Sequence, residues 1–259
     1  MASWGFVKMH GLSNDFVVVD ERDHEPFPVG RVPGICDRHR GIGADGVLVL
    51  SEPTSPDARA RMTVYNADGS LAEMCGNGLR CVARLLASSG ALSVETGAGI
   101  LRCSILGDGE VEVEMGPATI EGGLDSVVKA GGHTLRATRV RTGNPHLVTF
   151  DPVDDERAAA IAPILEHAFA GGTNVELAAV EAGGIRLRVW ERGVGFTRAC
   201  GTGACATVAA ACASGRARHG ETVRVTLAGG DLGIVVPAGG GSIRMRGSAV
   251  RVYEGRIDL

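Results

Sequence analysis

The chain carries one short motif twice, as Cys75-Gly76-Asn77-Gly78 and as Cys200-Gly201-Thr202-Gly203. The two copies lie 125 residues apart (200 − 75), close to half of the 259-residue chain. Each copy runs into an apolar stretch typical of a helix, residues 82–87 and 207–212, and each stretch is soon followed by a glycine. The pattern therefore predicts two helices, each beginning at a cysteine–glycine turn.

The segments that precede the two motifs match at the same offset. Arg61–Asn66 aligns with Arg186–Glu191, and both alternate apolar and polar residues with β-branched and aromatic side chains, as half-buried strands do. Each half of the chain thus contains a strand, a loop, a cysteine turn and a helix. Because a solenoid needs at least about three repeats, two copies predict two similar domains.

The composition fits a globular protein and excludes several classes of function. Hydrophobic residues make up 44% of the chain and the net charge is −4. A sizeable core can form, and nucleic-acid binding is disfavoured because no basic stretch alternates with aromatic residues. We find no signal-peptide pattern and no apolar run of about 18 residues. We therefore expect a cytoplasmic protein with no membrane partner and with its seven cysteines reduced.

The cysteine turns suggest chemistry because each combines a thiol with a helix N-terminus. Only the thiolate acts as a base or nucleophile, and the unpaired N–H groups and dipole of a helix N-terminus favour that anion by lowering the thiol pKa. The same N–H groups can receive a carboxylate, and glycines allow close approach of the backbone. One such turn alone is more often structural, but two at equivalent positions favour a paired acid/base site at Cys75 and Cys200.

The other five cysteines are predicted to be small buried residues. They form no C-x-x-C pair and have no histidine pair at zinc spacing, so we expect no metal site. These residues are Cys36, Cys81, Cys103, Cys205 and Cys212.

Three further segments carry polar side chains on predicted turns. Asn144 and His146 flank a proline that restricts the backbone, Asn174 follows a glycine pair, and Glu191 directly precedes Arg192. Taken singly, each is typical of a turn, a loop cap or a solvated ion pair.

Together, these segments resemble the diaminopimelate epimerase family, which inverts an amino-acid α-carbon without pyridoxal phosphate. The resemblance covers nearly the whole chain and rests on both cysteine turns and on residues 6–16, 40–45, 65–69, 143–146, 172–175 and 191–193. The cysteine turns are shared with a wider racemase superfamily, and the other segments narrow the resemblance to this family.

The resemblance implies an α/β (α+β) fold of two pseudo-symmetric domains, each a curved, mostly antiparallel sheet wrapped around a central helix. It places the active site in the cleft between the domains. We expect an N-terminal domain of residues 1–117 plus 248–259, to which the last strand returns, and a C-terminal domain of residues 118–247. The resemblance also implies a homodimer with Tyr253 in the segment that makes the contact.

The resemblance assigns roles to individual residues. Cys75 and Cys200 would be the two catalytic acid/bases, with His146 and Glu191 supporting them electrostatically. From the chemistry of the side chains we further expect Arg192 to pair with the distal carboxylate of the substrate, at the end that does not react, and Glu191 to meet an ammonium group. The implied substrate contacts are Asn14, Asn66, Gly76, Asn77, Asn144, Asn174, Glu191, Arg192, Gly201 and Thr202.

Three positions depart from the family pattern. Gly46 stands where glutamine is common, Ser13 where glycine is usual, and Phe196 where glutamate is usual. None lies in a cysteine turn, so they affect fine substrate contacts more than the activity itself.

The implied reaction is the epimerisation of L,L-2,6-diaminopimelate to the meso form, in lysine and cell-wall precursor biosynthesis. No cofactor is expected, because a pyridoxal Schiff base needs a lysine and neither Lys8 nor Lys129 lies in a loop typical of a cofactor site. Two alternatives stay open. One is a related racemase or epimerase of proline, hydroxyproline or another amino acid, and the other is a redox or ligand-binding protein in which Cys75 and Cys200 form a reversible disulfide.

Overall fold

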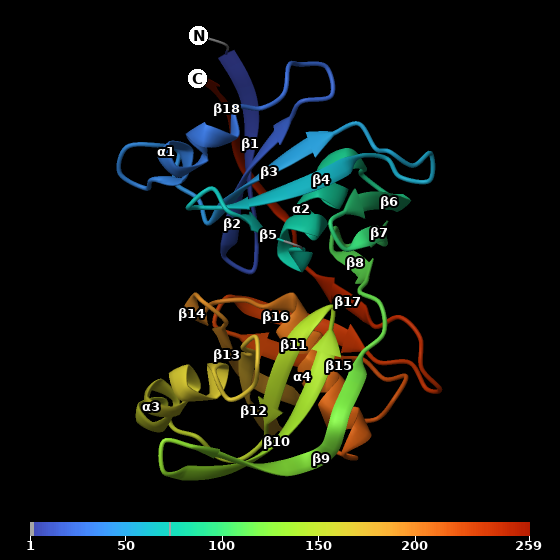
Figure 1. Cartoon of the computed structure of the whole chain (residues 1–259). Coiled ribbons are helices and arrows are strands. Elements are labelled where there is room, and N and C mark those ends of the chain that lie inside the picture. Colours follow the sequence, from blue (N-terminus) through green and yellow to red (C-terminus); the bar gives the residue numbers. More distant parts are fainter. Residues whose placement is uncertain (1–2, 73) are drawn as a thin grey trace. The chain divides into compact units, whose positions relative to one another are not determined.

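The computed structural model describes residues 3–72 and 74–259 (Figure 1). They form a mixed α/β fold dominated by strands, which confirms the predicted fold class. The chain divides into two compact units: unit 1 comprises Met1–Val113 and Gly247–Leu259, and unit 2 comprises Glu114–Arg246. The domain ranges given by the resemblance, with boundaries at 117 and 247, stay a prediction.

Unit 1 is built of strands packed around the helix that follows Cys75. This helix, α2, contacts strands β1, β2, β4, β6 and β7. The elements are β1 (Ser3–Gly11), β2 (Asn14–Asp20), η1 (Val29–Arg31), α1 (Val32–Cys36), β3 (Gly46–Ser51), β4 (Arg61–Asn66), β5 (Leu71–Ala72), α2 (Gly76–Leu86), β6 (Gly90–Thr96), β7 (Gly99–Ile105), β8 (Val111–Glu114, which crosses the unit boundary) and β18 (Val250–Asp258).

Unit 2 repeats this plan around the helix that follows Cys200. This helix, α4, contacts strands β9, β10, β11, β12 and β16. The elements are β9 (Thr119–Ala130), β10 (His133–Thr142), β11 (Asn144–Thr149), α3 (Asp155–Glu166), β12 (Asn174–Glu181), β13 (Gly184–Glu191), β14 (Gly195–Thr197), α4 (Gly201–Ala213), β15 (Val223–Leu227), β16 (Gly230–Val235) and β17 (Arg244–Gly247, which crosses the unit boundary).

The two units share one pattern of strand pairing. Strand β2 is parallel to β3 and β4 is parallel to β6, just as β11 is parallel to β12 and β13 is parallel to β15. The pairs β3–β4 and β12–β13 are antiparallel. Strand β18 pairs with β1 as β9 pairs with β10. The last strand of the chain therefore takes, in unit 1, the position that β9 takes in unit 2.

The central helices are buried because their side chains are small or apolar. In α4 every residue except Thr202 and Ala213 is buried, and most are alanine, glycine, cysteine or valine. A helix that is apolar all round belongs in a core, and small side chains let strands approach it closely. In α2, Gly76–Ala83 are buried and the last turn is partly exposed. Burial thus fixes the N-terminus of each helix, where the cysteine lies.

Within residues 3–72 and 74–259, no helix has both the length and the apolar character that a membrane span requires.

Candidate active site

In unit 1 the predicted site residues Asn14 and Asn66 lie where neighbouring strands begin or end, on the same side of the sheet. Strand β2 begins at Asn14, and the parallel strand β3 begins at Gly46, opposite Phe16. Strand β4 runs the other way, so its last residue, Asn66, pairs with Gly46. Asn66 is exposed, and its Nδ2 donates a hydrogen bond to Ser70 Oγ at 2.9 Å.

Unit 2 repeats this arrangement. Strand β11 begins at Asn144, and His146 on it pairs with Asn174, the first residue of the parallel strand β12. The antiparallel strand β13 ends at Glu191, and its preceding residue, Trp190, pairs with the residue after Asn174. The fold thus gathers the predicted residues of each unit at equivalent strand ends.

Cys75 is the N-cap residue of α2. Its sulfur accepts a hydrogen bond from the backbone N–H of Gly78 at 3.3 Å, which satisfies one of the unpaired donors of the first turn. A Cβ at Gly78 would lie 3.0 Å from Leu48 and 3.5 Å from the Cys75 sulfur. The absence of a side chain at Gly78 therefore leaves room for the Cys75 sulfur beside the first turn of α2. The Cys75 side chain is only partly buried.

Asn14 links Cys75 to the interior of unit 1. Its Oδ1 lies 3.7 Å from the sulfur of Cys75 and accepts a hydrogen bond from Asn77 Nδ2 at 3.1 Å. Its Nδ2 donates to Asp45 Oδ2 at 2.9 Å. Both asparagines were predicted to contact substrate, and the structure brings them together beside the thiol.

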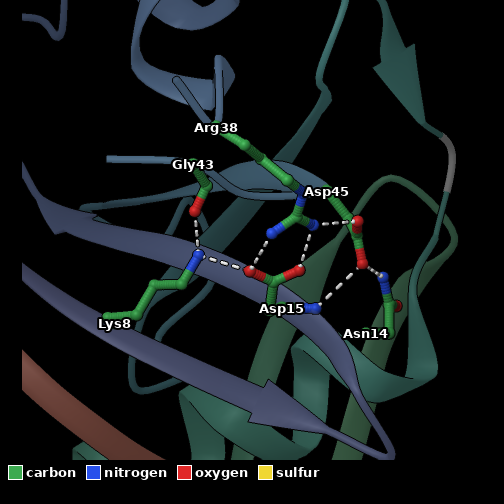
Figure 2. A network of polar contacts seen from close by, with 6 residues as sticks. All are labelled: Lys8, Asn14, Asp15, Arg38, Gly43 and Asp45. Carbon is green, nitrogen blue, oxygen red and sulfur yellow. Dashed lines mark hydrogen bonds and ion pairs between the residues drawn. The ribbon is translucent and has the colours of Figure 1, made fainter. Parts of the chain in front are cut away.

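Behind Asn14 lies a charged cluster of Lys8, Asp15, Arg38 and Asp45 (Figure 2). Arg38 donates to each carboxylate at 2.7 Å, and Lys8 donates to Asp15 at 2.5 Å and to the carbonyl of Gly43. Burial raises the pKa of Asp15, but hydrogen bonds from Arg38 and Lys8 outweigh it and bring the pKa to about 2. Sequence reasoning missed this cluster, because only the parallel pairing of β2 with β3 brings residues 15 and 45 together.

Cys200 is the N-cap residue of α4 in the same backbone conformation as Cys75. Its φ and ψ are −135° and 108°, against −138° and 105° for Cys75. The residue is only 6% exposed. Burial raises the pKa of the Cys200 thiol well above its usual value, and the carboxylates of Glu191 and Glu176 raise it further. The expectation that the helix N-terminus lowers the thiol pKa is therefore wrong for Cys200, because desolvation and two negative charges outweigh the helix.

His146 is fully buried between two polar side chains. Its Nδ1 lies 2.7 Å from Glu176 Oε1, and its Nε2 lies 2.8 Å from Asn144 Oδ1. The ring nitrogens of His146 are thus each within hydrogen-bonding distance of one side-chain oxygen. These two contacts fix the plane of the ring.

Glu176 is a site residue that sequence reasoning missed. It is fully buried on β12, and within the described part of the chain its Oε2 has no hydrogen-bond partner. A Cβ at Gly203 would lie 2.7 Å from Glu176 Oε1 and 3.3 Å from the Cys200 sulfur. The carboxylate therefore lies directly against the first turn of α4. The available signal was a glutamate inside an otherwise apolar strand, two residues after Asn174.

Glu191 and Thr202 complete the surroundings of Cys200. Burial raises the pKa of Glu191, although Thr197 donates a hydrogen bond to its Oε1 at 2.5 Å and opposes that rise. The hydroxyl of Thr202 lies 3.5 Å from the Cys200 sulfur, and its carbonyl accepts a hydrogen bond from Thr142 at 3.2 Å.

Arg192 is exposed, and both its backbone and its guanidinium group are anchored by hydrogen bonds. Its N–H donates to Asn174 Oδ1 at 2.9 Å, and its Nη1 donates to the carbonyl of Gly171 at 2.7 Å. Asn174 Nδ2 donates to the carbonyl of Pro145. Glu166 secures the flanks of this turn by accepting from the Trp190 indole at 2.6 Å and from a backbone N–H. The guanidinium is thus held on a rigid turn with donors left for a carboxylate.

The three departures from the family pattern have clear local settings. A Cβ at Gly46 would lie 2.4 Å from the carbonyl oxygen of Tyr65, so a side chain there requires β4 to shift. Ser13 has a φ of +63°, in the left-handed region that glycine adopts without cost. Phe196 packs edge-on against Trp190 with ring centroids 5.1 Å apart.

Each unit therefore presents a thiol on a helix N-terminus with polar side chains around it. The backbone N–H groups of Gly76 and Asn77 in one unit, and of Gly201 and Thr202 in the other, belong to first helical turns, whose N–H groups point toward the N-terminal end of the helix. Such groups bind carboxylates, and a nearby thiol can give or take a proton. The remaining five cysteines are buried, as predicted.

Comparison with known proteins agrees with this geometry. A sequence model of the family described as diaminopimelate epimerase matches residues 6–121 and 138–252, so that it covers both cysteine turns. A diaminopimelate epimerase of Rhodospirillum centenum is 43% identical over 274 residues, covering 97% of this chain and 91% of the relative. One from a Synechocystis strain is 41% identical over 278 residues and covers 98% and 99%.

Solved structures of more distant proteins share the fold. A probable proline racemase from Agrobacterium radiobacter superposes with a TM-score of 0.76 at 18% identity, covering 99% of this chain and 93% of that one. A hydroxyproline epimerase from Agrobacterium vitis gives a TM-score of 0.75 at 16% identity and covers 99% and 91%.

Proposed function

The chain belongs to the diaminopimelate epimerase family and is an isomerase that epimerises diaminopimelate; we propose that it does so with two thiols, those of Cys75 and Cys200. The observation that carries the proposal is the matched pair of thiol N-caps, one in each unit, with the same backbone conformation. Inverting a carbon needs a base and an acid acting on opposite faces, and two cysteines in equivalent settings can supply both.

The proton balance of the proposed reaction is simple. One thiolate removes the α-hydrogen and becomes a thiol, and the electron pair stays on the α-carbon and its carboxylate. The other thiol then delivers its proton to that carbon and becomes a thiolate. In the reverse direction the two cysteines exchange roles, so one pair serves both directions.

The carbanion is stabilised at the substrate carboxylate. N–H groups of Gly76 and Asn77, and of Gly201 and Thr202, donate to its oxygens as negative charge develops. Preorganised donors of this kind are worth on the order of 3–4 kcal/mol each in other enzymes. The helix dipoles act in the same sense.

The different surroundings of the two thiols determine which is the acid and which is the base before the substrate binds. Burial and two carboxylates raise the pKa of Cys200, so it holds its proton at neutral pH and serves as the acid. Cys75 is less buried and serves as the base. His146 is oriented by Glu176, and its ring with Glu191 sets the charge around Cys200.

The substrate has a second amino-acid centre that must be held without reacting. The exposed guanidinium of Arg192 can pair with the distal carboxylate in a bidentate manner, and Asn174 holds the backbone of the same turn. We expect Arg192→Ala to reduce kcat/KM for diaminopimelate severely while the thiols remain reactive. Unchanged kinetics would contradict this role.

The epimerisation assay tests the two-thiol mechanism with purified full-length protein and L,L-diaminopimelate. Conversion to the meso form is expected for the wild type and is expected to be lost in both Cys75→Ser and Cys200→Ser. L-proline and trans-4-hydroxy-L-proline serve as competing substrates that lack the distal carboxylate. Conversion of these would contradict the role of the distal carboxylate in substrate selection, and a wild-type rate in either serine variant would contradict the two-thiol mechanism. Reversible disulfide formation without turnover would favour a redox function instead.

We also propose a cytoplasmic location. A pair of reduced thiols requires a reducing compartment, and the cytoplasm is such a compartment.

We further propose that the protein is a homodimer. Strand β18 exposes Val250, Val252 and Tyr253, and an apolar strand surface of this kind supports a homodimer through that strand. Sedimentation of the wild type and of Tyr253→Lys would test it, since the variant is expected to sediment as a monomer.

A further inference from the structure

Asn14 presents its amide oxygen, and not its amide nitrogen, to the sulfur of Cys75. A side-chain amide accepts at one end and donates at the other, so turning it over reverses what the thiol meets. We infer that Asp45 is a positioning residue for the reaction: it fixes the Asn14 amide with its oxygen toward Cys75 and thereby makes Cys75 a stronger base. This inference rests on the proposed role of Cys75 as an acid/base.

Asn14 contacts the charged cluster through Asp45 (Figure 2). An ionised carboxylate only accepts hydrogen bonds. Asp45 Oδ1 accepts from Arg38 at 2.7 Å, and its Oδ2 accepts from the backbone N–H of Asp15 at 3.0 Å. Because donors hold both oxygens in place, Asn14 can join Asp45 Oδ2 only through its Nδ2, which it does at 2.9 Å.

The oxygen of the Asn14 amide is held from the other side by Asn77 and Arg80. Arg80 on α2 is fully buried, and its guanidinium, which only donates, reaches Asn77 Oδ1 at 2.9 Å. That contact turns Asn77 Nδ2 toward Asn14 Oδ1, at 3.1 Å. An arginine at one end and a carboxylate at the other therefore require the same orientation of the Asn14 amide.

The orientation of the Asn14 amide decides which form of the Cys75 thiol is stabilised. An amide oxygen can accept from the S–H of Cys75 but offers nothing to a thiolate, so it stabilises the protonated form. A base whose protonated form is stabilised takes a proton more readily from a weakly acidic α-carbon. Other groups that act on Cys75 include the N–H of Gly78, which the sulfur accepts, and Cys81, which is coupled to it electrostatically.

Asp45→Asn tests the inference because it keeps the shape and reverses one hydrogen-bonding group. The charge-assisted contact with Arg38 is stronger than the contact with the backbone N–H of Asp15, so the oxygen stays at the Oδ1 position and the new amide nitrogen takes the Oδ2 position, at the cost of the Asp15 contact. Asn14 then turns its oxygen to that new amide nitrogen and its own NH₂ group to Cys75, where it stabilises the thiolate, and it gives up the hydrogen bond from Asn77.

Two readouts are expected to move in opposite directions in Asp45→Asn. The rate at which iodoacetamide alkylates Cys75, followed by mass spectrometry of the peptide that carries it, is expected to rise severalfold below neutral pH, because its pH profile shifts down by about one unit while the nucleophilicity of the thiolate falls with its pKa. The epimerisation kcat is expected to fall at pH values above the thiol pKa, where Cys75 is a thiolate in both proteins and only its basicity differs. A merely structural role for Asp45 would lower turnover without that shift of the alkylation profile.

The matched control is Asp20→Asn. Asp20 ends the strand that Asn14 begins and has its own ion pair with Arg22 at 2.5 Å, so the same chemical change there is expected to move neither readout. The exchange Asn14→Asp with Asp45→Asn again places an oxygen toward Cys75 and is expected to return the alkylation profile to wild type or beyond.

Alkylation needs no turnover, so this test can fail while the epimerisation assay succeeds, and the reverse also holds. An Asp45→Asn profile that coincides with that of Asp20→Asn overturns the inference. If Asp45→Asn does not fold, Arg38→Gln provides the second variant. Its side chain is half exposed, its loss loosens Asp45, and it is expected to shift the alkylation profile in the same direction. A wild-type profile in Arg38→Gln would then overturn the inference.

Discussion

At the scale of single residues, the surroundings of the Cys200 thiol affect its pKa more than its place on a helix does. A helix N-terminus lowers a thiol pKa in general, yet Cys200 has a raised pKa because it is buried beside Glu191 and Glu176. Sequence analysis identified Cys75, Cys200 and His146 as candidates because they belong to short motifs. It could not identify Glu176 or Asp45, because their contacts depend on which strands become neighbours.

Replacing the buried carboxylate of Glu176 is expected to affect both His146 and Cys200. In Glu176→Gln the negative charge that helps to raise the pKa of Cys200 is gone, so the alkylation profile of Cys200 is expected to move to lower pH. The His146 ring loses a charged acceptor, and kcat is expected to fall on the order of 10²-fold. Glu181→Gln is the matched control, since Glu181 ends the same strand in an exposed ion pair with Arg186. Equal alkylation profiles in the two variants would contradict the role of Glu176.

At the scale of elements, the strand–turn–helix unit was predictable and its repetition was only partly so. The motifs around Cys75 and Cys200 share an offset of 125 residues, and a fixed-offset comparison finds them. Asn14 and Asn144 begin the equivalent strands β2 and β11, but they are 130 residues apart (144 − 14). The intervening loops differ in length, so that correspondence becomes visible only through the pairing of the strands.

The first turn of α4 offers a test of this close packing. Gly203→Ala should favour the helix by up to about 1 kcal/mol through its higher helix propensity. Its Cβ would lie 2.7 Å from Glu176 Oε1 and 3.3 Å from the Cys200 sulfur, so turnover is expected to fall at least tenfold.

Gly34→Ala is the control for this substitution. It lies in helix α1, where a Cβ meets nothing within 4 Å, so wild-type turnover is expected. Circular dichroism and thermal unfolding verify that both variants fold. Wild-type turnover in Gly203→Ala would contradict the close packing of Glu176 against α4.

At the scale of the whole molecule, the chain consists of two units of the same plan, and β18 completes the first. Duplication was readable from the sequence, but the return of the last strand to β1 was available only through the family resemblance. The local sequence of β18 does not identify the strand with which it pairs. That pairing depends on which strand edge in the folded unit still has unpaired backbone groups.

The ion pairs of unit 1 predict a pH dependence of its stability. The pKa of Asp15 is about 2 in the folded protein and about 3.9 in an unfolded chain. A lowered folded pKa stabilises the fold above the unfolded value, and this contribution is lost as the pH falls from about 4 through about 2.

The unfolding of unit 1 can be followed by the fluorescence of Trp4, which is buried against Phe27, in a Trp190→Phe background. The difference in free energy of unfolding between this protein and its Asp15→Asn variant is expected to be largest at neutral pH and to shrink toward zero at pH 2. A difference that does not change with pH would contradict the assignment.

Solvent-deuterium labelling during the first few per cent of L,L-diaminopimelate turnover tests most directly whether two thiols act on one carbon. If one cysteine removes the proton and the other delivers a solvent-derived one, the meso product carries one deuterium at the inverted centre and the recovered substrate carries almost none. In Cys75→Ser and in Cys200→Ser the labelled product is expected to disappear. Equal label in product and recovered substrate, or labelled product from either serine variant at the wild-type rate, would show that a single base does the work.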